Sequence, residues 1–282
     1  MPVGKHFVFA VLCSLALFTK GEIKIPLDIA PDAVDDMYEG CTKDALDKLV
    51  LSDLLHEELN NSVVFQTAWL QPQSSACPKV IPGGLKQHTT ALRTIAADEG
   101  TLRKALNNAV YEHGRNATTY EDDFHFKSLH FLLMDSIRLL DPGLSVCTTV
   151  YSFSDPAFSA QKGSTVRLGR FWVGYSSLEI LKKASDLSDE VILSITTCFF
   201  AELGVNICSK EPMTLLSPTE EFTVEDVRDI EEEDNDVSYQ MIVLKHSQLK
   251  STHNCYIFSG SPDISSHWLF LALLTPSIFI VS

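Results

Sequence analysis

The sequence predicts an α+β fold in which N-terminal helices pack on a mixed, largely antiparallel β core. In the first half of the chain, apolar residues recur at spacings of three and four, which is typical of amphipathic helices. After Ser145 the pattern changes to short runs of β-branched and aromatic residues, which is typical of strands. Few long helical crossovers separate these runs, and this argues against a doubly wound parallel sheet.

Two amphipathic helices are expected before the strands begin. The first covers residues 101–113, with its apolar residues on one face and Gly114 as a stop signal. The second covers residues 124–140, and the sequence Asp-Pro-Gly at 141–143 ends it.

The second half of the chain contains the predicted strands. They are residues 146–153, 165–175, 191–199, 213–216 and 239–244. Residues 225–236 form an acidic run opposed only by Arg228. We expect this run to be a solvated loop, because its carboxylates lack the spacing of a calcium-binding loop.

The composition indicates a folded, acidic protein. The chain has 282 residues, 45% of them hydrophobic, which is enough for a sizeable core. With 37 acidic against 22 basic residues the net charge is -15, which excludes a nucleic-acid partner. No repeat or Gly/Ser/Pro-rich linker divides the middle, so residues 22–259 are predicted to form one domain.

The N-terminus has the features of an export signal. After Lys5, residues 7–18 form an almost wholly apolar run, which fits a signal-peptide core and is too short to cross a bilayer. A buried helix is the alternative, but such a helix normally has a polar face and this segment has none. Residues 1–21 are therefore predicted to be a cleaved signal peptide.

The C-terminus has the features of a GPI-attachment signal. Residues 268–281 are almost wholly apolar, and a short polar spacer separates them from the small residues Ser259, Gly260 and Ser261. Residues 260–282 are predicted to be this signal, with attachment at Ser259 or Gly260. A retained hydrophobic tail or a final buried strand are the alternatives, and Pro276 weakens a continuous helix. The protein is accordingly expected on the cell surface, or otherwise secreted.

Secretion would also account for the number of cysteines. Once Cys13 is removed with the signal peptide, six of the seven cysteines remain, an even set for an oxidising compartment. Their connectivity does not follow from the spacing. The sequons at Asn60 and Asn116 predict N-glycosylation.

Standard catalytic and metal-binding motifs are absent from the sequence. There is no phosphate-binding loop, zinc spacing, nucleophile elbow or kinase signature, and no metal is expected. His125 and His130 flank an aromatic helix face, where a structural role is the default. The residues alone therefore indicate a secreted, disulfide-bonded α+β domain of undefined activity.

Several short segments, in order along nearly all of the mature chain, resemble one enzyme family. They are Asp-Asp-Met-Tyr-Glu-Gly-Cys at 35–41, Phe-His-Phe-Lys-Ser-Leu-His-Phe-Leu-Leu at 124–133, Thr-Val-Tyr at 149–151, Val-Arg-Leu-Gly-Arg-Phe at 166–171, Ser-Ile-Thr-Thr-Cys at 194–198, Leu-Leu-Ser-Pro at 215–218 and Asn-Cys at 254–255. The family is that of the vertebrate ecto-mono-ADP-ribosyltransferases. These GPI-linked or secreted enzymes move ADP-ribose from NAD to protein arginine.

The resemblance implies two disulfides, NAD as the substrate and protein arginines as acceptors. Cys41 would pair with Cys255, and Cys147 with Cys198. Cys77 and Cys208 would either bridge each other or remain thiols.

The family's chemistry depends on an arginine, a serine and a Glu-x-Glu pair. The arginine follows the tyrosine equivalent to Tyr151 and holds the NAD phosphates, and the serine orients the nicotinamide ribose. The second glutamate polarises the ribose 2′-hydroxyl and stabilises the oxocarbenium-like charge, while the first engages the acceptor guanidinium.

This sequence departs from the family pattern at the arginine and at the second glutamate. The residue after Tyr151 is Ser152, whose hydroxyl cannot replace a charged bidentate guanidinium. The glutamate pair falls on Glu211 and Met213, and a thioether neither carries charge nor accepts a hydrogen bond strongly.

The serine position can be aligned in two ways. Without a gap it falls within residues 173–175, and with a two-residue insertion Ser176 and Ser177 restore it. The insertion is slightly favoured, because it also places Leu178 at the family's usual leucine.

Two hypotheses follow from these departures. In the first, the protein keeps the fold as a cell-surface binding protein for an extracellular partner and has lost or reduced transferase activity. In the second, it is an active NAD-dependent arginine ADP-ribosyltransferase or weak NAD glycohydrolase that recruits another carboxylate, such as Glu202 or Glu211. A binding module unrelated to NAD is the third and weakest alternative.

Overall fold

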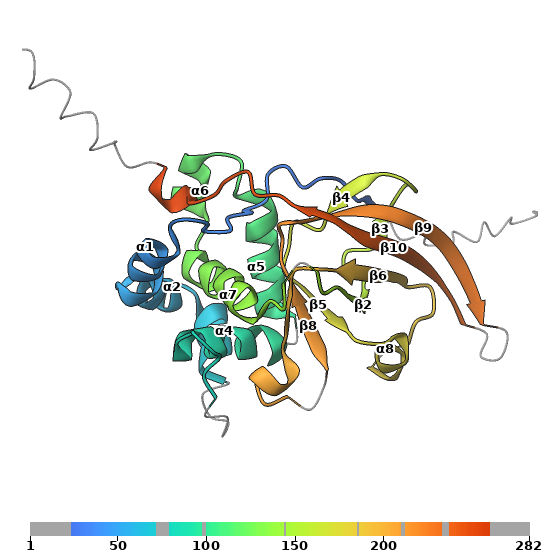
Figure 1. The fold of residues 1–282 in the computed structure, drawn as a ribbon, viewed down its shortest axis with the longest axis horizontal. Helices are drawn as coiled ribbons and strands as arrows, with labels where there is room; N and C mark the ends of the chain where they lie inside the picture. The colour runs from blue at the N-terminus through green and yellow to red at the C-terminus, as the bar shows by residue number, and fades with distance from the viewer. Residues whose placement is uncertain are drawn as a thin grey trace, which may run out of the picture.

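A computed structural model describes residues 24–71, 79–97, 100–143, 145–184, 186–209, 212–232 and 237–259. It confirms the α+β class: a helical layer packs against a mixed, mostly antiparallel sheet (Figure 1). The helices are α1 (Thr42–Leu46), α2 (Leu54–Asn61), α3 (Val63–Leu70), α4 (Lys86–Ala97), α5 (Thr101–Glu112), α6 (Ala117–Asp123), α7 (Lys127–Leu140) and α8 (Leu178–Ala184). A π-helical turn, Asp47–Leu51, joins α1 to α2.

The main sheet has eight strands in the order β4-β9-β10-β6-β2-β5-β8-β7. These are β2 (Thr148–Phe153), β4 (Thr165–Arg167), β5 (Trp172–Tyr175), β6 (Val191–Thr197), β7 (Phe200–Glu202), β8 (Met213–Leu216), β9 (Glu220–Glu232) and β10 (Val237–Leu249). Only β10 and β6 pair in parallel within this sheet; its other described pairs are antiparallel. A separate parallel pair joins β1 (Ile25–Pro26) to β3 (Phe158–Ser159).

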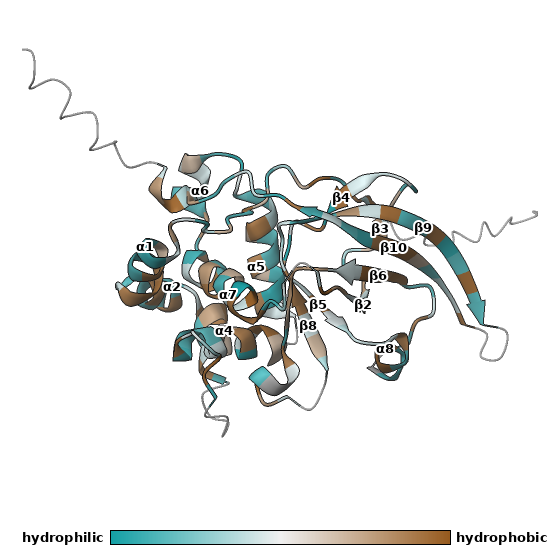
Figure 2. Ribbon diagram, viewed as in Figure 1, coloured by the Kyte–Doolittle hydropathy of each residue, from teal (hydrophilic) through white to brown (hydrophobic). Residues whose placement is uncertain are grey.

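The hydrophobic core lies on both faces of this sheet. Between the sheet and the helices, Phe131 of α7 belongs to the same buried cluster as Val173 of β5 and Leu215 of β8. On the other face, Val150 and Leu193 belong to a second cluster. Figure 2 shows the hydrophobic segments of α7 and of the central strands. Because side chains alternate along a strand, the central strands contribute to both clusters.

The predicted helix 101–113 corresponds to α5, whereas the helix predicted from residue 124 begins at Lys127. The later start is set by a distant residue. The backbone N–H groups of Lys127 and Ser128 donate to the Glu58 carboxylate at 2.8 and 3.0 Å. A buried carboxyl group from α2 therefore caps the N-terminus of α7.

The single strand predicted over residues 165–175 is wrong, because the structure divides it into β4 and β5. Gly169 lies between them with a left-handed φ of +59°, and a Cβ at this position would lie 2.4 Å from the Ala30 Cβ. The Asn107 side chain bonds the Phe171 backbone on both sides, donating to its C=O at 2.8 Å and accepting from its N–H at 3.0 Å. These contacts turn the chain away from an extended path.

The prediction of a solvated loop at residues 225–236 is also wrong for its described part. Residues 225–232 belong to β9, which pairs with β10 in a long hairpin (Figure 1). Lysines offset part of the acidic charge: the Lys245 Nζ lies 3.2 Å from Glu225, and the Lys182 Nζ 2.6 Å from Glu232. Cross-strand pairing and these ion pairs stabilise a strand that its acidic composition disfavours.

Where both cysteines are described, the structure joins Cys41 to Cys255 and Cys147 to Cys198 by disulfides. They are the two pairs that the resemblance implied. Cys208 is also disulfide-bonded, whereas Cys77 lies outside the described residues. The predicted signal peptide and residues 260–282 lie outside them as well. Within the part that the structure describes, no helix has both the length and the apolar character needed to cross a membrane.

His130 has the structural role expected from the sequence. It is fully buried, its Nδ1 lies 2.9 Å from the Tyr38 hydroxyl, and its Nε2 lies 3.0 Å from the Val34 C=O. Burial lowers its pKa to about 4, so the ring is neutral at physiological pH.

Candidate functional site: a cavity between the helical layer and the sheet

A cavity of about 510 Å³ lies between the helical layer and the central strands. The end of α4 and one face of α5 line one side, and β2, β5 and the start of β8 line the other. Two of the residues predicted from the sequence, Ser152 and Met213, both line it. The fold therefore brings together the two positions at which the chain departs from the family pattern.

Strand pairing brings β2, β5 and β8 side by side at the cavity. Tyr151 of β2 pairs with Tyr175 of β5, and Tyr175 pairs with Met213 of β8. Three strands thus place these residues side by side across the sheet. Ser152 follows Tyr151 directly, and successive strand residues point to opposite faces. Register therefore aligns Tyr151 with Met213, whereas Ser152 is related to Met213 only because both line the cavity.

The groups at these two positions are neutral. The Ser152 side chain is buried, and its hydroxyl donates to the Val173 C=O at 3.0 Å. Met213 is half-buried and packs against the core between the sheet and the helices. These two side chains therefore offer neither a charged group for a diphosphate nor a strong acceptor for a ribose hydroxyl. The residues at these two positions do not fit the polar groups of NAD.

The remaining predicted site residues are placed differently. Tyr175, rather than Ser176 or Ser177, lines the cavity. The Ser177 Oγ accepts from the Ile180 N–H at 3.3 Å, so Ser177 caps the N-terminus of α8. Glu211 lies outside the described residues.

Glu202, a carboxylate considered as a replacement, is exposed and pairs with Thr214 at the edge of the sheet. Paired residues point to the same face and successive residues to opposite faces. Glu202 therefore shares its face with Thr214 and not with Met213. It is not among the residues that line the cavity.

The lining of the cavity also includes three cationic residues that the sequence did not predict for the site. Arg103 and Lys104 come from α5, and Arg170 comes from the segment between β4 and β5. Asp155 is the single carboxylate among the described lining residues. The available signal was the polar face of the predicted helix 101–113, but spacing within one helix does not reveal what that face borders.

The predicted glycosylation positions are both on the surface. Asn60 is exposed near the end of α2, and Asn116 is exposed at the start of α6. The Asn116 Oδ1 accepts from the Thr119 N–H at 2.9 Å, so it caps α6. Glycosylation at both positions stays a prediction.

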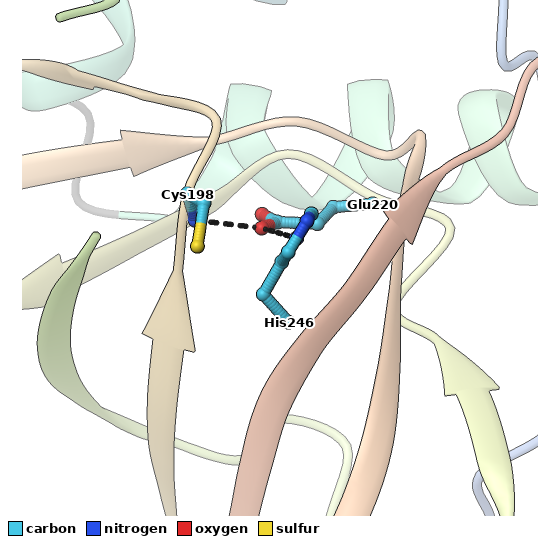
Figure 3. Close-up of side chains that lie close together, drawn as sticks. All are labelled: Cys198, Glu220 and His246. Atoms are coloured by element: carbon cyan, nitrogen blue, oxygen red, sulfur yellow. Dashed lines mark hydrogen bonds and ion pairs between the residues drawn. The ribbon is translucent and has the colours of Figure 1, made fainter. Parts of the chain in front are cut away.

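Cys198, Glu220 and His246 form a compact group at another place on the sheet (Figure 3). The buried Glu220 carboxylate lies 2.6 Å from the His246 Nδ1 and accepts from the Cys198 N–H at 2.8 Å. These three residue types can hold a metal ion, but the Cys198 sulfur is bonded to Cys147 and is not a thiolate. These contacts hold the end of β6 against β9 and β10.

Comparisons with known proteins agree with this fold. The family model described as NAD:arginine ADP-ribosyltransferase matches residues 27–247. GPI-linked NAD(P)(+)--arginine ADP-ribosyltransferase 1 of Mus musculus is 33% identical over 71% of this chain and 64% of its own length, just under two thirds. Ecto-ADP-ribosyltransferase 5 of Homo sapiens is 32% identical over 71% of this chain and 71% of its own.

A solved structure shows the same fold. A mutant of the eukaryotic mono-ADP-ribosyltransferase ART2.2, crystallised in complex with NADH, aligns with a TM-score of 0.66 and 27% identity. The alignment covers 82% of this chain and 98% of that one.

Proposed function

Because the chain belongs to the NAD:arginine ADP-ribosyltransferase family, we propose that it is a cell-surface member whose transferase activity is lost or greatly reduced. Family membership supplies the fold and the expectation of NAD and protein arginines as substrates. The names of the ecto-ADP-ribosyltransferase relatives, one of them GPI-linked, support the location.

The single observation that supports the loss of activity is that Ser152 and Met213 line the same cavity. Cleavage of a glycosidic bond develops positive charge on the sugar, which a carboxylate stabilises and a thioether does not. Removing one preorganised group of this kind typically costs a factor of about 10²–10³ in rate. Loss of the phosphate-binding guanidinium removes a charge-assisted bidentate contact as well.

NAD turnover by the purified mature protein tests this proposal. We expect no turnover above background, with or without agmatine as a soluble guanidinium acceptor. Turnover by the native chain would instead support the alternative, an active arginine ADP-ribosyltransferase or NAD glycohydrolase with a relocated carboxylate. Asp155 in the cavity and Glu211 would then be the first residues to replace.

A gain-of-function variant tests the assignment of the two positions. The double substitution Ser152→Arg/Met213→Glu is expected to raise NAD hydrolysis at least about tenfold, because it restores both charges. Ser145→Arg/Ser238→Glu makes the same charge changes at exposed positions outside the cavity and serves as the control. Equal rates for the two double variants would show that the family's arginine and glutamate lie elsewhere.

A further inference from the structure

We propose that Cys147, Cys198, Glu220 and His246 form a zinc-binding site once the disulfide between the two cysteines is reduced. This site is independent of the proposed loss of activity, because none of the four residues is among those that line the cavity. The supporting observation is that two sulfurs, a carboxylate and an imidazole converge near the ends of four neighbouring strands (Figure 3).

Four strands that are adjacent in the sheet, β9, β10, β6 and β2, bring these side chains together. Cys198 directly follows β6, and Cys147 directly precedes β2, which is antiparallel to β6. Glu220 is the first residue of β9, and His246 lies near the end of the antiparallel β10. Because the residues come from four separate segments, no zinc-binding spacing appears in the sequence.

The group already has nearly the spacing of a metal site. One ligand atom from each of Cys198, Glu220 and His246 lies within 4.8 Å of the other two. Zinc–ligand bonds of about 2.0–2.3 Å at tetrahedral angles place ligand atoms roughly 3.5 Å apart. The required shift is small, and the His246 side chain, 19% exposed, lies beside a β-bulge that loosens the ladder locally.

The Glu220 carboxylate is buried and is oriented by its neighbours. The Thr197 hydroxyl donates to its Oε2 at 2.5 Å, and the Cys198 N–H donates to its Oε1 at 2.8 Å. The His246 Nδ1 lies 2.6 Å from the same Oε1. Zinc would take the place of this last contact, and the Thr197 bond would persist as the supporting hydrogen bond that metal-binding carboxylates commonly have.

The disulfide is accessible from one side. Cys147 is exposed, whereas Cys198 is 3% exposed. A dithiol reductant therefore attacks the Cys147 sulfur: a new S–S bond forms there, and the electron pair of the broken bond passes to the Cys198 sulfur. The second thiolate of the reductant then displaces the Cys147 sulfur and closes the reductant's own disulfide. The protein gains two electrons and two protons, and the dithiol is oxidised.

The freed sulfurs of Cys147 and Cys198 determine which metal fits the site. Zinc displaces the two thiol protons, which pass to solvent, and binds both thiolates. Thiolate and imidazole ligands select zinc over magnesium and calcium, which take oxygen ligands. With the Glu220 carboxylate and the His246 ring, the set has the four ligands of a closed zinc site. The metal would then replace the disulfide as the cross-link between the ends of β2 and β6.

Zinc titration of the purified mature protein tests the proposal. The protein is compared before and after reduction with tris(2-carboxyethyl)phosphine, in competition with a chromophoric chelator. We expect one zinc per reduced chain, bound at least about a hundredfold more tightly than by the oxidised chain, because reduction supplies two thiolate ligands. Equal binding by the two forms would contradict the proposal.

Cysteine mapping distinguishes this site from the other thiols that reduction exposes. In the reduced chain, zinc should protect Cys147 and Cys198 from alkylation by iodoacetamide, because a metal-bound thiolate is a poor nucleophile. Cys41 and Cys255 should stay reactive, which mass spectrometry of the peptides measures. Protection of Cys41 and Cys255 alone would place the metal elsewhere and overturn the proposal.

A cysteine variant tests the site with the other disulfides intact. Cys147→Ser leaves a free thiol on Cys198 without any reductant, and this variant should bind zinc. The control Cys255→Ser frees the Cys41 thiol instead and should not. If either variant folds poorly, cysteine mapping of the reduced native chain decides. A folded Cys147→Ser chain and a reduced native chain that both fail to bind zinc would refute the site.

Substitutions of the other two ligands complete the test. In the reduced chain, His246→Ala and Glu220→Gln are each expected to weaken zinc binding at least about tenfold. His125→Ala removes an exposed imidazole outside the group, and affinity should stay within about twofold. Unchanged affinity in folded variants at both His246 and Glu220 would show that zinc does not bind here.

Discussion

At the scale of single residues, buried carboxylates in this protein differ in pKa because their partners differ. Burial raises the pKa of Asp35, but hydrogen bonds from His253, Arg167 and Thr252 outweigh it and hold the pKa well below its usual range. For Asp36, burial prevails over three backbone N–H donors and raises the pKa to about 6. For Glu58, burial likewise raises the pKa to about 7, despite the N–H groups of Ser128 and Lys127.

The Glu58 shift predicts a pH dependence of stability. The folded-state pKa lies above the unfolded value of 4.5, so the native state favours the protonated form. Its contribution to the free energy of unfolding is full below pH 4.5. It declines as the pH rises through about 7, by roughly 3 kcal/mol at most.

The variant Glu58→Gln isolates this effect from other titrating groups. Its amide accepts from at most one of the two N–H groups at the start of α7, so the variant should be less stable than the native chain at pH 4.5. The gap should narrow by pH 8, because the native chain loses stability and the neutral amide does not. Urea unfolding at both pH values measures the gap, and a constant gap would contradict the prediction.

At the scale of elements, α5 is the helix that shapes the site. Its apolar residues Leu102, Leu106 and Val110 are buried in the core, which fixes the rotation of the helix. Another face of the helix then borders the cavity, and Arg103 and Lys104 of this face line it. The helix also holds the segment between β4 and β5 through Asn107.

The Asn107 contact predicts a large loss in Asn107→Ala. The substitution leaves the backbone N–H and C=O of the buried Phe171 without these partners, which costs about 1–3 kcal/mol for each group left unsatisfied. Thermal unfolding measures this loss of stability. Asn108→Ala, at the exposed neighbouring position, should leave stability nearly unchanged.

At the scale of the whole molecule, hydrogen bonds and a disulfide join the two ends of the domain. The Asp36 carboxylate accepts from the backbone N–H of Cys255 at 2.8 Å and of Tyr256 at 2.9 Å. Beside this contact, Cys41 and Cys255 form a disulfide across 214 residues. The Ser259 hydroxyl donates to the Tyr256 C=O at 2.7 Å within the last turn that the structure describes, next to the predicted attachment site.

The predicted GPI anchor can be tested on intact cells. Phosphatidylinositol-specific phospholipase C should release the full-length chain from the surface, because the lipid is its only predicted attachment. A chain that stops at Ser259 should appear in the medium without treatment and serves as the control. Retention of the full-length chain after treatment would favour a retained hydrophobic tail.

Local patterns predicted the helix α5, most of α7 and the strand β8 closely, because each depends on periodicity within one segment. They failed for the acidic strand β9, which is stabilised by β10 and by lysines distant in sequence. They also missed the break between β4 and β5, where a contact from α5 decides the path of the chain.

The sequence by itself determined the fold class, the placement of helices before the strands and, through the family resemblance, the replacement of two site residues by Ser152 and Met213. Only the tertiary structure decided that Ser152 and Met213 line one cavity, and that Arg170 and α5 line it with them. The physical reason is that periodicity sets the face of each element locally. Strand register and helix packing, which join distant segments, set what that face contacts.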